Sequence, residues 1–307
     1  MDRQTGTRPR IEIARQPSLQ HIIKRFPKMV MPAVNIYLHK TDTNLEWVIV
    51  VAQAADAQQG LIVACIMQQQ VMRIVSWYVV PECTDHGLGQ MLLAALESWC
   101  RKQEIKSLTL DLRDQTTFYE RASHILQKQG WSKQRPLVHR FKVAASTLSN
   151  LNWNSFQRRP REIEILPWNS LSHRQFEDLM RRYQGNNQFP ADIMPFVNEQ
   201  RIENAVSLGL CRGNRVVGWI IAHQVRPSLI EYSTLYIDPG QRQTGATILL
   251  LGESFQRLAD TDVDYVIFQI KVDNDLMLRF ARKRFQPILN QATLFRCEKP
   301  LNTDHMD

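Results

Sequence analysis

The stretch VVPECTDHGLGQMLLAALESWC, residues 79–100, connects an apolar run to a long segment whose apolar residues have helical spacing. A proline and two glycines separate the two parts. A strand that ends in such a loop and opens a helix leaves the first N–H groups of the helix unpaired. Together with the helix dipole, these donors favour an anion. The loop over 84–89 is therefore either a tight turn or a phosphate-binding site.

The same arrangement recurs 158 residues further along the chain. A constant offset across a strand, a loop and a helix is rare by chance, so the chain is expected to hold two copies of one unit. The aligned residues are GLIVA (60–64) with GWIIA (218–222), Tyr78 with Tyr236, Pro81 with Pro239, Gly87 with Gly245, and Leu92 and Leu93 with Leu250 and Leu251.

Each copy is predicted to contain two strands, the loop, a helix, a third strand and a closing helix, which together indicate an α/β fold. The second copy also opens with a strand over 162–168 and helical stretches over 172–183 and 194–206. Residues 146–161, rich in Ser and Asn and then basic, are interpreted as a linker. The predicted domains are therefore 1–145 and 162–307.

Composition narrows the functional classes. Five cysteines without CxxC spacing predict reduced thiols and argue against a zinc site. The net charge of +8 is spread along the chain, and its densest cluster, at 157–162, falls at the linker, which argues against nucleic-acid binding. Neither a signal peptide nor an apolar run of membrane-spanning length is visible, so a cytoplasmic protein without a membrane segment is expected.

The order strand, proline-headed glycine loop, amphipathic helix, strand and closing helix resembles the Gcn5-related N-acetyltransferase (GNAT) family. In that family a loop R/Q-x-x-G-x-G/A cradles the pyrophosphate of coenzyme A. The resemblance covers most of both halves. It implies two tandem GNAT folds, each a mixed, mostly antiparallel central sheet flanked by helices, with acetyl-CoA as co-substrate and no metal.

Neither copy matches the loop pattern in full. Thr84 stands where Arg or Gln is usual in the first copy, and Thr247 replaces the final Gly or Ala in the second. Asn274 leads the last helix of the second copy, where the first copy has Glu120. The residues that the resemblance assigns to coenzyme binding are Val79, Val80, Thr84, His86, Gly87, Leu88 and Gly89 in the first copy, and Leu235, Tyr236, Ile237, Arg242, Gln243, Thr244, Gly245, Ala246, Thr247 and Asn274 in the second.

Acetyl transfer requires a neutral amine, and a general base near the amine supplies it. Glu231 is the candidate base, because it precedes the second loop at the position of the family's catalytic glutamate. Its counterpart in the first copy is Arg73, which cannot act as a base. The alternative is a strand glutamate on the solvated face or in a salt bridge. The family's oxyanion contact, a backbone N–H group, would lie near 235–237 or 77–79.

The family's general acid is a tyrosine of the last helix. Phe280 and Leu126 occupy that register and carry no hydroxyl group. Tyr119 and Tyr236 lie out of register, and both are predicted to be packing residues.

The predicted function is transfer of an acetyl group from acetyl-CoA to a primary amine of a small-molecule or peptide acceptor, with the second copy catalytic. The loop over 183–196 is expected on the acceptor side. Two alternatives stay open at this point. The first copy, which has the better glycine pair, could be the catalytic one, or the protein could be a non-catalytic acyl-CoA sensor or partner-binding module.

Overall fold

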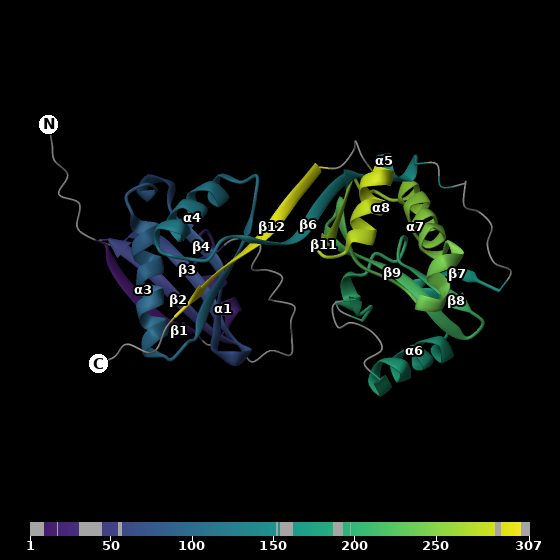
Figure 1. Ribbon diagram of the computed structural model, residues 1–307, viewed down its shortest axis with the longest axis horizontal. Helices are drawn as coiled ribbons and strands as arrows, with labels where there is room; N and C mark the ends of the chain where they lie inside the picture. Colours follow the sequence, from purple (N-terminus) through teal and green to yellow (C-terminus); the bar gives the residue numbers. More distant parts are fainter. Residues whose placement is uncertain are drawn as a thin grey trace. The chain divides into compact units, whose positions relative to one another are not determined.

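A computed structural model describes residues 9–16, 18–30, 45–54, 57–151, 153, 162–186, 193–196, 198–285 and 290–301. The chain divides into two compact units (Figure 1). Unit 1 comprises Met1–Leu137 with Thr293–Asp307, and unit 2 comprises Val138–Ala292. In the part of the chain that is described, no helix has the length and apolar character needed to cross a membrane.

Unit 1 is a mixed sheet with helices on both faces. Its strands follow the order β1-β2-β3-β4-β5-β12, and neighbouring strands are antiparallel except for β4 and β5. The elements are β1 (Arg10–Gln16), α1 (Leu19–Arg25), β2 (Glu46–Ala54), β3 (Ala57–Met67), β4 (Val71–Val79), α3 (Leu88–Lys102), β5 (Ser107–Arg113), α4 (Thr117–Lys128) and β12 (Asn290–Pro300).

Helix α3 shows why this sequence covers a sheet. Its buried residues recur every three or four positions, so they form one face along the helix. That face and the buried residues of α4 pack on one side of the sheet, and α1 packs on the other. The glycine loop therefore lies between a central strand and a helix that the core holds in place.

Unit 2 repeats this architecture. Its strand order is β6-β11-β10-β9-β8-β7, again antiparallel except for one parallel pair, β10 with β11. The elements are β6 (Arg135–Ala144), α5 (Ala145–Ser149), β7 (Glu164–Pro167), α6 (His173–Asn186), β8 (Leu208–Arg212), β9 (Arg215–Arg226), β10 (Leu229–Ile237), α7 (Ala246–Gln256), β11 (Tyr265–Lys271) and α8 (Asp275–Phe285).

The two faces of the unit 2 sheet are covered by different helices. Figure 1 shows α5, α7 and α8 on one face and α6 on the other. The first face holds the larger apolar cluster, and the α6 face holds a smaller one that includes Trp219 and Tyr236. Both units thus have the predicted fold class, a mixed and mostly antiparallel sheet flanked by helices.

The units do not follow the predicted division at 146–161. The segment 293–300 of β12 belongs to unit 1, where it pairs with β5, and the segment 138–144 of β6 belongs to unit 2, where it pairs with β11. Each compact unit therefore receives its last strand from the other half of the chain. The predicted linker also begins inside unit 2, since Leu148 of α5 and Trp153 are buried in its core. Residues 154–161 lie outside the described residues.

The helix predicted over 194–206 is wrong. The described residues of this segment contain a 3₁₀ turn, Glu199–Arg201, and no α-helix. The backbone instead lies along β9. Ile202 forms a β-bridge with His223, and the backbone N–H of Glu203 donates to the carbonyl oxygen of Ala222 at 2.8 Å. Hydrogen bonds to a neighbouring strand thus replace those of a helix.

Candidate active site

The two predicted loops have the same backbone geometry. In unit 1, β4 is followed by a 3₁₀ turn at Pro81–Cys83 and then α3. In unit 2, β10 is followed by a 3₁₀ helix at Pro239–Thr244 and then α7. Gly87 and Gly245 are the N-cap residues of these helices, and both have φ of 77°. That left-handed conformation explains why glycine stands at both positions.

The unit 2 loop leaves room above its glycine. Among the described residues, no atom lies within 4 Å of a Cβ built on Gly245. Arg242 is exposed, and its Nε donates to the carbonyl oxygen of Ile237 at 3.1 Å, which ties the side chain to the end of β10. The first-turn N–H groups of α7 and the Arg242 cation together favour an anionic ligand. Gln243 and Thr244 contribute backbone to the 3₁₀ helix, and Thr247 is half-buried in the first turn of α7.

In the unit 1 loop, side chains and glycines are engaged in contacts within unit 1 itself. The Thr84 hydroxyl donates to the carbonyl oxygen of Val80 at 3.1 Å. A Cβ on the buried Gly89 would lie 3.3 Å from the Trp77 ring, so this glycine is explained by ring packing alone. His86 is exposed in the turn, and Val79 is half-buried. Both glycines of this loop are therefore explained by the fold, Gly87 by its left-handed backbone and Gly89 by packing against Trp77, without a bound phosphate.

Two of the predicted coenzyme contacts can offer only their backbone. Leu88 and Ala246 begin their helices with side chains buried in the cores of unit 1 and unit 2. Leu235 is half-buried and packs against the unit 2 core, and Ile237 is buried in it. The chain at these positions can therefore present N–H groups and little side-chain chemistry.

The central strand of each unit, β10 or β4, contains a β-bulge at the equivalent position. In β10, Ser233 is the extra residue between the pairs Tyr232↔Ala222 and Thr234↔Ile221. In β4, Val75 is the extra residue at the equivalent position, 158 residues earlier. Bulges of this kind are common next to active sites, because they redirect side chains and end strand pairing.

The parallel ladder stops where the bulge begins. β10 pairs with β11 from Leu229 to Tyr232, and β4 pairs with β5 from Val71 to Ile74. In the described part of the chain, each central strand continues for five more residues and pairs there on one side, β10 with β9 and β4 with β3. This separation lies directly before the glycine loop, where an extended ligand could add its own hydrogen bonds to the strand.

Glu231 lies on β10 immediately before this separation. Its side chain is half-buried, and its Oε1 accepts a hydrogen bond from Gln269 Nε2 at 2.7 Å. Its cross-strand partner on β9 is His223, whose Nδ1 lies 2.8 Å from the Ser233 hydroxyl. Sequence reasoning missed Gln269, His223 and Ser233. The 158-residue offset does not point to them, because their counterparts in unit 1 have different side chains.

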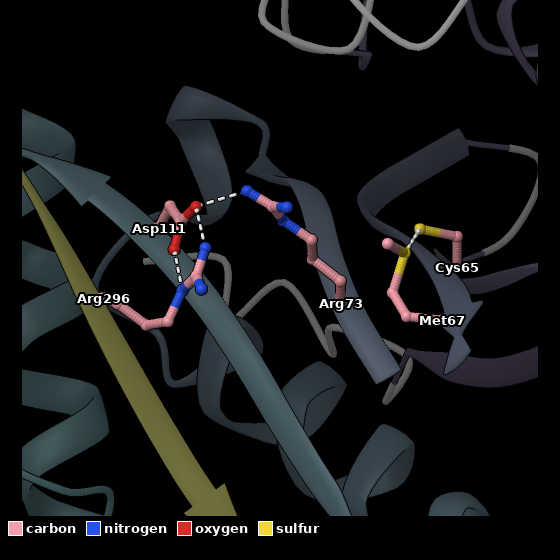
Figure 2. A network of polar contacts seen from close by, with 5 residues as sticks. All are labelled: Cys65, Met67, Arg73, Asp111 and Arg296. Atoms are coloured by element: carbon pink, nitrogen blue, oxygen red, sulfur yellow. Dashed lines mark hydrogen bonds and ion pairs between the residues drawn. The ribbon is translucent and has the colours of Figure 1, made fainter. Parts of the chain in front are cut away.

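The equivalent position in unit 1 carries an ion-pair network instead. Arg73 donates to Asp111, and Arg296 binds both carboxylate oxygens of Asp111, with distances of 2.8 and 2.9 Å for the Arg296 contacts (Figure 2). Arg73 and Asp111 align with Glu231 and Gln269 at the 158-residue offset. Cys65, the counterpart of His223, is buried and contacts Met67 Sδ at 3.7 Å (Figure 2). Unit 1 thus holds a guanidinium, a carboxylate and a thiol where unit 2 holds a carboxylate, an amide and an imidazole.

The last helices are capped by different side chains. Asn274 Oδ1 accepts a hydrogen bond from Met277 N at 3.1 Å, and Thr116 Oγ1 accepts one from Tyr119 N at 3.1 Å. The assignment of Glu120 to the Asn274 register is therefore wrong. Glu120 lies in the first turn of α4, and Thr116 holds the cap at the 158-residue offset.

The two tyrosines considered as acids are engaged in packing. Tyr236 stacks on Trp219 with ring centroids 4.5 Å apart. Burial, and then the Asp238 side chain, raise the pKa of Tyr236 to about 12. Tyr119 packs against Phe295, its hydroxyl contacts Gln134, and burial raises its pKa. Raised pKa values make both hydroxyls poorer acids at neutral pH.

A cavity of about 580 Å³ lies beside the unit 2 loop, where β8, β9 and β10 end near it. Its lining residues are Arg212, Arg215, Val217, Tyr236, Asp238, Pro239, Gly240 and Gln241. Of the predicted acceptor-side loop 183–196, residues 187–192 lie outside the described residues. Phe196 packs near Trp168 with ring centroids 6.3 Å apart. In the described ranges, no group of three His, Cys, Asp or Glu side chains could hold a metal ion.

Solved structures show the same fold. A tandem GNAT protein from the clavulanic acid biosynthesis pathway has 12% identity and a TM-score of 0.64, covering 97% of this chain and 100% of that chain. A GCN5-related N-acetyltransferase from Sphaerobacter thermophilus has 14% identity and a TM-score of 0.53, covering 94% and 96%. A conserved protein from Enterococcus faecalis, described as a probable N-acyltransferase, has 10% identity and a TM-score of 0.51, covering 96% and 74%.

The chain is therefore a tandem GNAT-fold protein. Residues 19–130, which lie within unit 1, match the model of the acetyltransferase (GNAT) family. A comparison with curated proteins found no match.

Proposed function

We propose that this protein is an acyl-CoA-dependent N-acetyltransferase, and that unit 2 carries the catalysis. It would move an acetyl group from acetyl-CoA to a primary amine of a small-molecule or peptide acceptor. The observation that supports this division most directly is the contrast between Glu231 with Gln269 in unit 2 and Arg73 with Asp111 in unit 1. The same strand positions carry a carboxylate in one unit and a guanidinium in the other.

Acetyl-CoA would bind where the central strand of unit 2 separates from β11. Its pyrophosphate would lie at the first turn of α7, near Gly245 and Arg242, where N–H groups, the helix dipole and a cation favour an anion. Its amide-containing arm would run along β10 beyond Ser233 and approach Asn274. The lack of any described atom near a Gly245 Cβ supports the close approach that a phosphate needs.

Glu231 would remove the proton from the acceptor amine. A lysine-like ammonium group has a pKa of about 10.4, so making it neutral at pH 7 costs about 4–5 kcal/mol. A carboxylate at the reaction centre lowers that cost. A backbone N–H group near 235–237 would polarise the thioester carbonyl, since β10 has left the parallel ladder by then.

Unit 1 would keep the fold without the base. Arg73, which is ion-paired with Asp111, occupies the position equivalent to Glu231. The Thr84 hydroxyl is hydrogen-bonded to the carbonyl oxygen of Val80. Coenzyme binding at Gly87 without transfer remains compatible with this arrangement. The opposite division, with unit 1 catalytic, has no carboxylate at the equivalent position of β4 to support it.

The proposal is tested by measuring acetyl-CoA binding by calorimetry and then thiol release with a panel of primary amines. The panel would include a lysine peptide, a polyamine, an aromatic ethylamine and an amino sugar. We expect binding and thiol release with at least one amine, and Glu231→Gln should lower kcat by about 10²–10⁴-fold. Glu164→Gln is the matched control, because Glu164 is an exposed strand glutamate of unit 2.

A non-catalytic acyl-CoA sensor is the second candidate. It is favoured by the packing and hydrogen-bond contacts that engage Tyr119 and Tyr236, the two tyrosines considered as acids. Binding of acetyl-CoA without thiol release on any amine would support this candidate over the enzyme. Absence of binding would contradict both.

A further inference from the structure

Three polar side chains meet at the bulge of unit 2. His223 on β9 and Glu231 on β10 are directly opposite each other in the antiparallel ladder, so their side chains lie on the same face of the sheet. Ser233, the bulged residue, brings its hydroxyl to 2.8 Å from His223 Nδ1. The bulge therefore adds a hydroxyl group to the Glu231–His223 pair, which a regular strand would not do.

The hydrogen bonds of Ser233 select one tautomer of His223. The Ser233 hydroxyl has a single proton, and its oxygen also lies 3.2 Å from the carbonyl oxygen of Ile221. Both contacts are satisfied together only when the hydroxyl donates to Ile221 and accepts a proton from Nδ1 of His223. In the neutral ring, Nε2 is consequently the basic nitrogen.

These side chains face the same side of the sheet as α6, the helix that leads into the predicted acceptor-side loop 183–196. Alternate residues of β9, Ile220 and Ala222, point into the core under α7, whereas Trp219 and Ile221 belong to the α6 face. His223 continues the second series and is half-buried, and Ser233 is exposed. Among the described residues, the charged Arg201 and Glu203 flank Ile202, which forms the β-bridge with His223, and Arg201 donates to the carbonyl oxygen of Gln224.

Unit 1 shows what the fold requires at these positions. The counterparts of His223, Glu231 and Ser233 are Cys65, Arg73 and Val75. Unit 1 forms the same bulge and the same strand pairs with these residues. The fold therefore does not need an imidazole, a carboxylate and a hydroxyl at this place, and their presence together in unit 2 calls for a chemical explanation.

We propose that His223 is a proton-relay residue that acts through Glu231, with Ser233 holding its tautomer. This inference rests on the proposed function. The Glu231 carboxylate takes one proton from the acceptor ammonium, and the amine becomes neutral. The protonated carboxyl then passes that proton to Nε2 of His223, which becomes imidazolium and releases it to solvent.

The remaining steps also balance. The neutral nitrogen attacks the thioester carbon, and a C–N bond forms. The C–S bond then breaks, and the thiolate leaves with the second proton of the amine nitrogen, giving free thiol. The net change is one ammonium and one thioester converted to one amide, one thiol and one proton, and that proton is the one that His223 carries away.

The test is the pH profile of kcat/KM on whichever amine of the panel releases thiol from acetyl-CoA. In the wild-type chain, kcat/KM should fall as the pH drops through the range in which imidazole becomes protonated, since a protonated His223 cannot receive the proton. His223→Gln should lower kcat by about tenfold or more at neutral pH. It should also remove the fall in this pH range, with the KM for acetyl-CoA unchanged.

Two further variants separate a relay from a structural role. Glu231→Gln with His223→Gln should be no slower than Glu231→Gln alone, because the relay acts through the carboxylate. His173→Gln, a change at an exposed histidine of α6, should behave as wild type. Nitrogen NMR of the full chain should show the Nδ1–H tautomer in wild type, and this preference should be lost in Ser233→Ala.

Each contrary result identifies what has failed. A His223→Gln chain with the wild-type rate and pH profile overturns the relay and leaves the proposed function standing. An Nε2–H tautomer in the wild-type chain, or additive losses in the double variant, does the same. Absence of thiol release by the wild-type chain on every amine overturns the proposed function and the relay with it.

Discussion

At the scale of single residues, the two units differ most where their backbones agree best. The bulge, the strand pairs and the N-cap glycine recur at one offset, yet Glu231 stands opposite His223 in unit 2 where Arg73 stands opposite Cys65 in unit 1. Side chains at these positions face away from the main core, so substitution there changes chemistry without unfolding the sheet. One unit can therefore carry the proposed base, Glu231, while the other carries a guanidinium in the same strand frame.

Two aligned glycines should respond differently to the same substitution. A Cβ on Gly218 would lie 2.8 Å from the backbone oxygen of Tyr236, whereas a Cβ on Gly60 would mainly meet the end of the Leu92 side chain at 2.7 Å. A side chain can move and a paired backbone cannot. We expect Gly218→Ala to lower the free energy of unfolding by about 1–3 kcal/mol. Gly60→Ala should cost less, and urea unfolding of both variants measures the difference. Equal losses would contradict this explanation.

The buried thiol of Cys100 should weaken the fold at alkaline pH. Burial, and then nearby Glu97, raise its pKa from about 9 to about 12. A raised pKa means that its contribution to stability is complete below pH 9 and is lost as the pH rises toward 12. The wild-type chain should therefore lose stability relative to Cys100→Ala by up to about 1.4 kcal/mol per pH unit above pH 9. Denaturant unfolding at pH 8, 9 and 10 tests this, and a constant difference would rule it out.

At the scale of elements, the spacing of apolar residues and the glycine and proline turn residues predicted most of the helices and strands. The strands over 71–79 and 229–237 and the helices that follow the two loops lie where apolar spacing placed them. The segment 194–206 was predicted as a helix because its apolar spacing fits one. Its backbone instead bonds to β9, and this tertiary pairing is not visible in a local pattern.

The candidate site was partly predictable for the same reason. Gly245, Arg242 and Glu231 could be placed from the repeat, because each occupies a register that the second copy shares with the first or with the GNAT pattern. His223 and Gln269 could not be placed, since they lie on neighbouring strands and only strand pairing brings them to Glu231. A bulge that adds Ser233 to this group leaves no local signal in the sequence.

At the scale of the whole molecule, the chain cannot be cut between its two copies without affecting both units. Unit 1 takes β12 from the end of the chain, and this strand contributes more than backbone pairing. Arg296 binds Asp111, and Lys299 Nζ lies 2.6 Å from Glu97 Oε2, a carboxylate that is only 5% exposed. Removing the cation of a buried pair typically costs several kcal/mol, because the other charge stays buried.

Deletion of residues 293–307 should therefore loosen unit 1 and spare unit 2. We expect hydrogen exchange at Leu108, Leu110 and Leu112 of β5 to accelerate by at least 100-fold, because these residues lose their β12 partners. The amides of β11, which pair with β6 and β10, should keep their protection. Deletion of residues 302–307 alone is the control and should leave β5 protected. Unchanged β5 protection in the longer deletion would contradict the assigned role of β12.

The sequence by itself determined the two copies, the α/β class, the glycine turns and the difference between Glu231 and Arg73, because these depend on local period, φ requirements and residue type. Only the tertiary structure decided which half supplies the last strand of each unit and which side chains surround Glu231. Both depend on pairing between strands far apart in sequence. The stability of such pairs comes from backbone hydrogen bonds and a shared core, and neither is encoded in any single stretch.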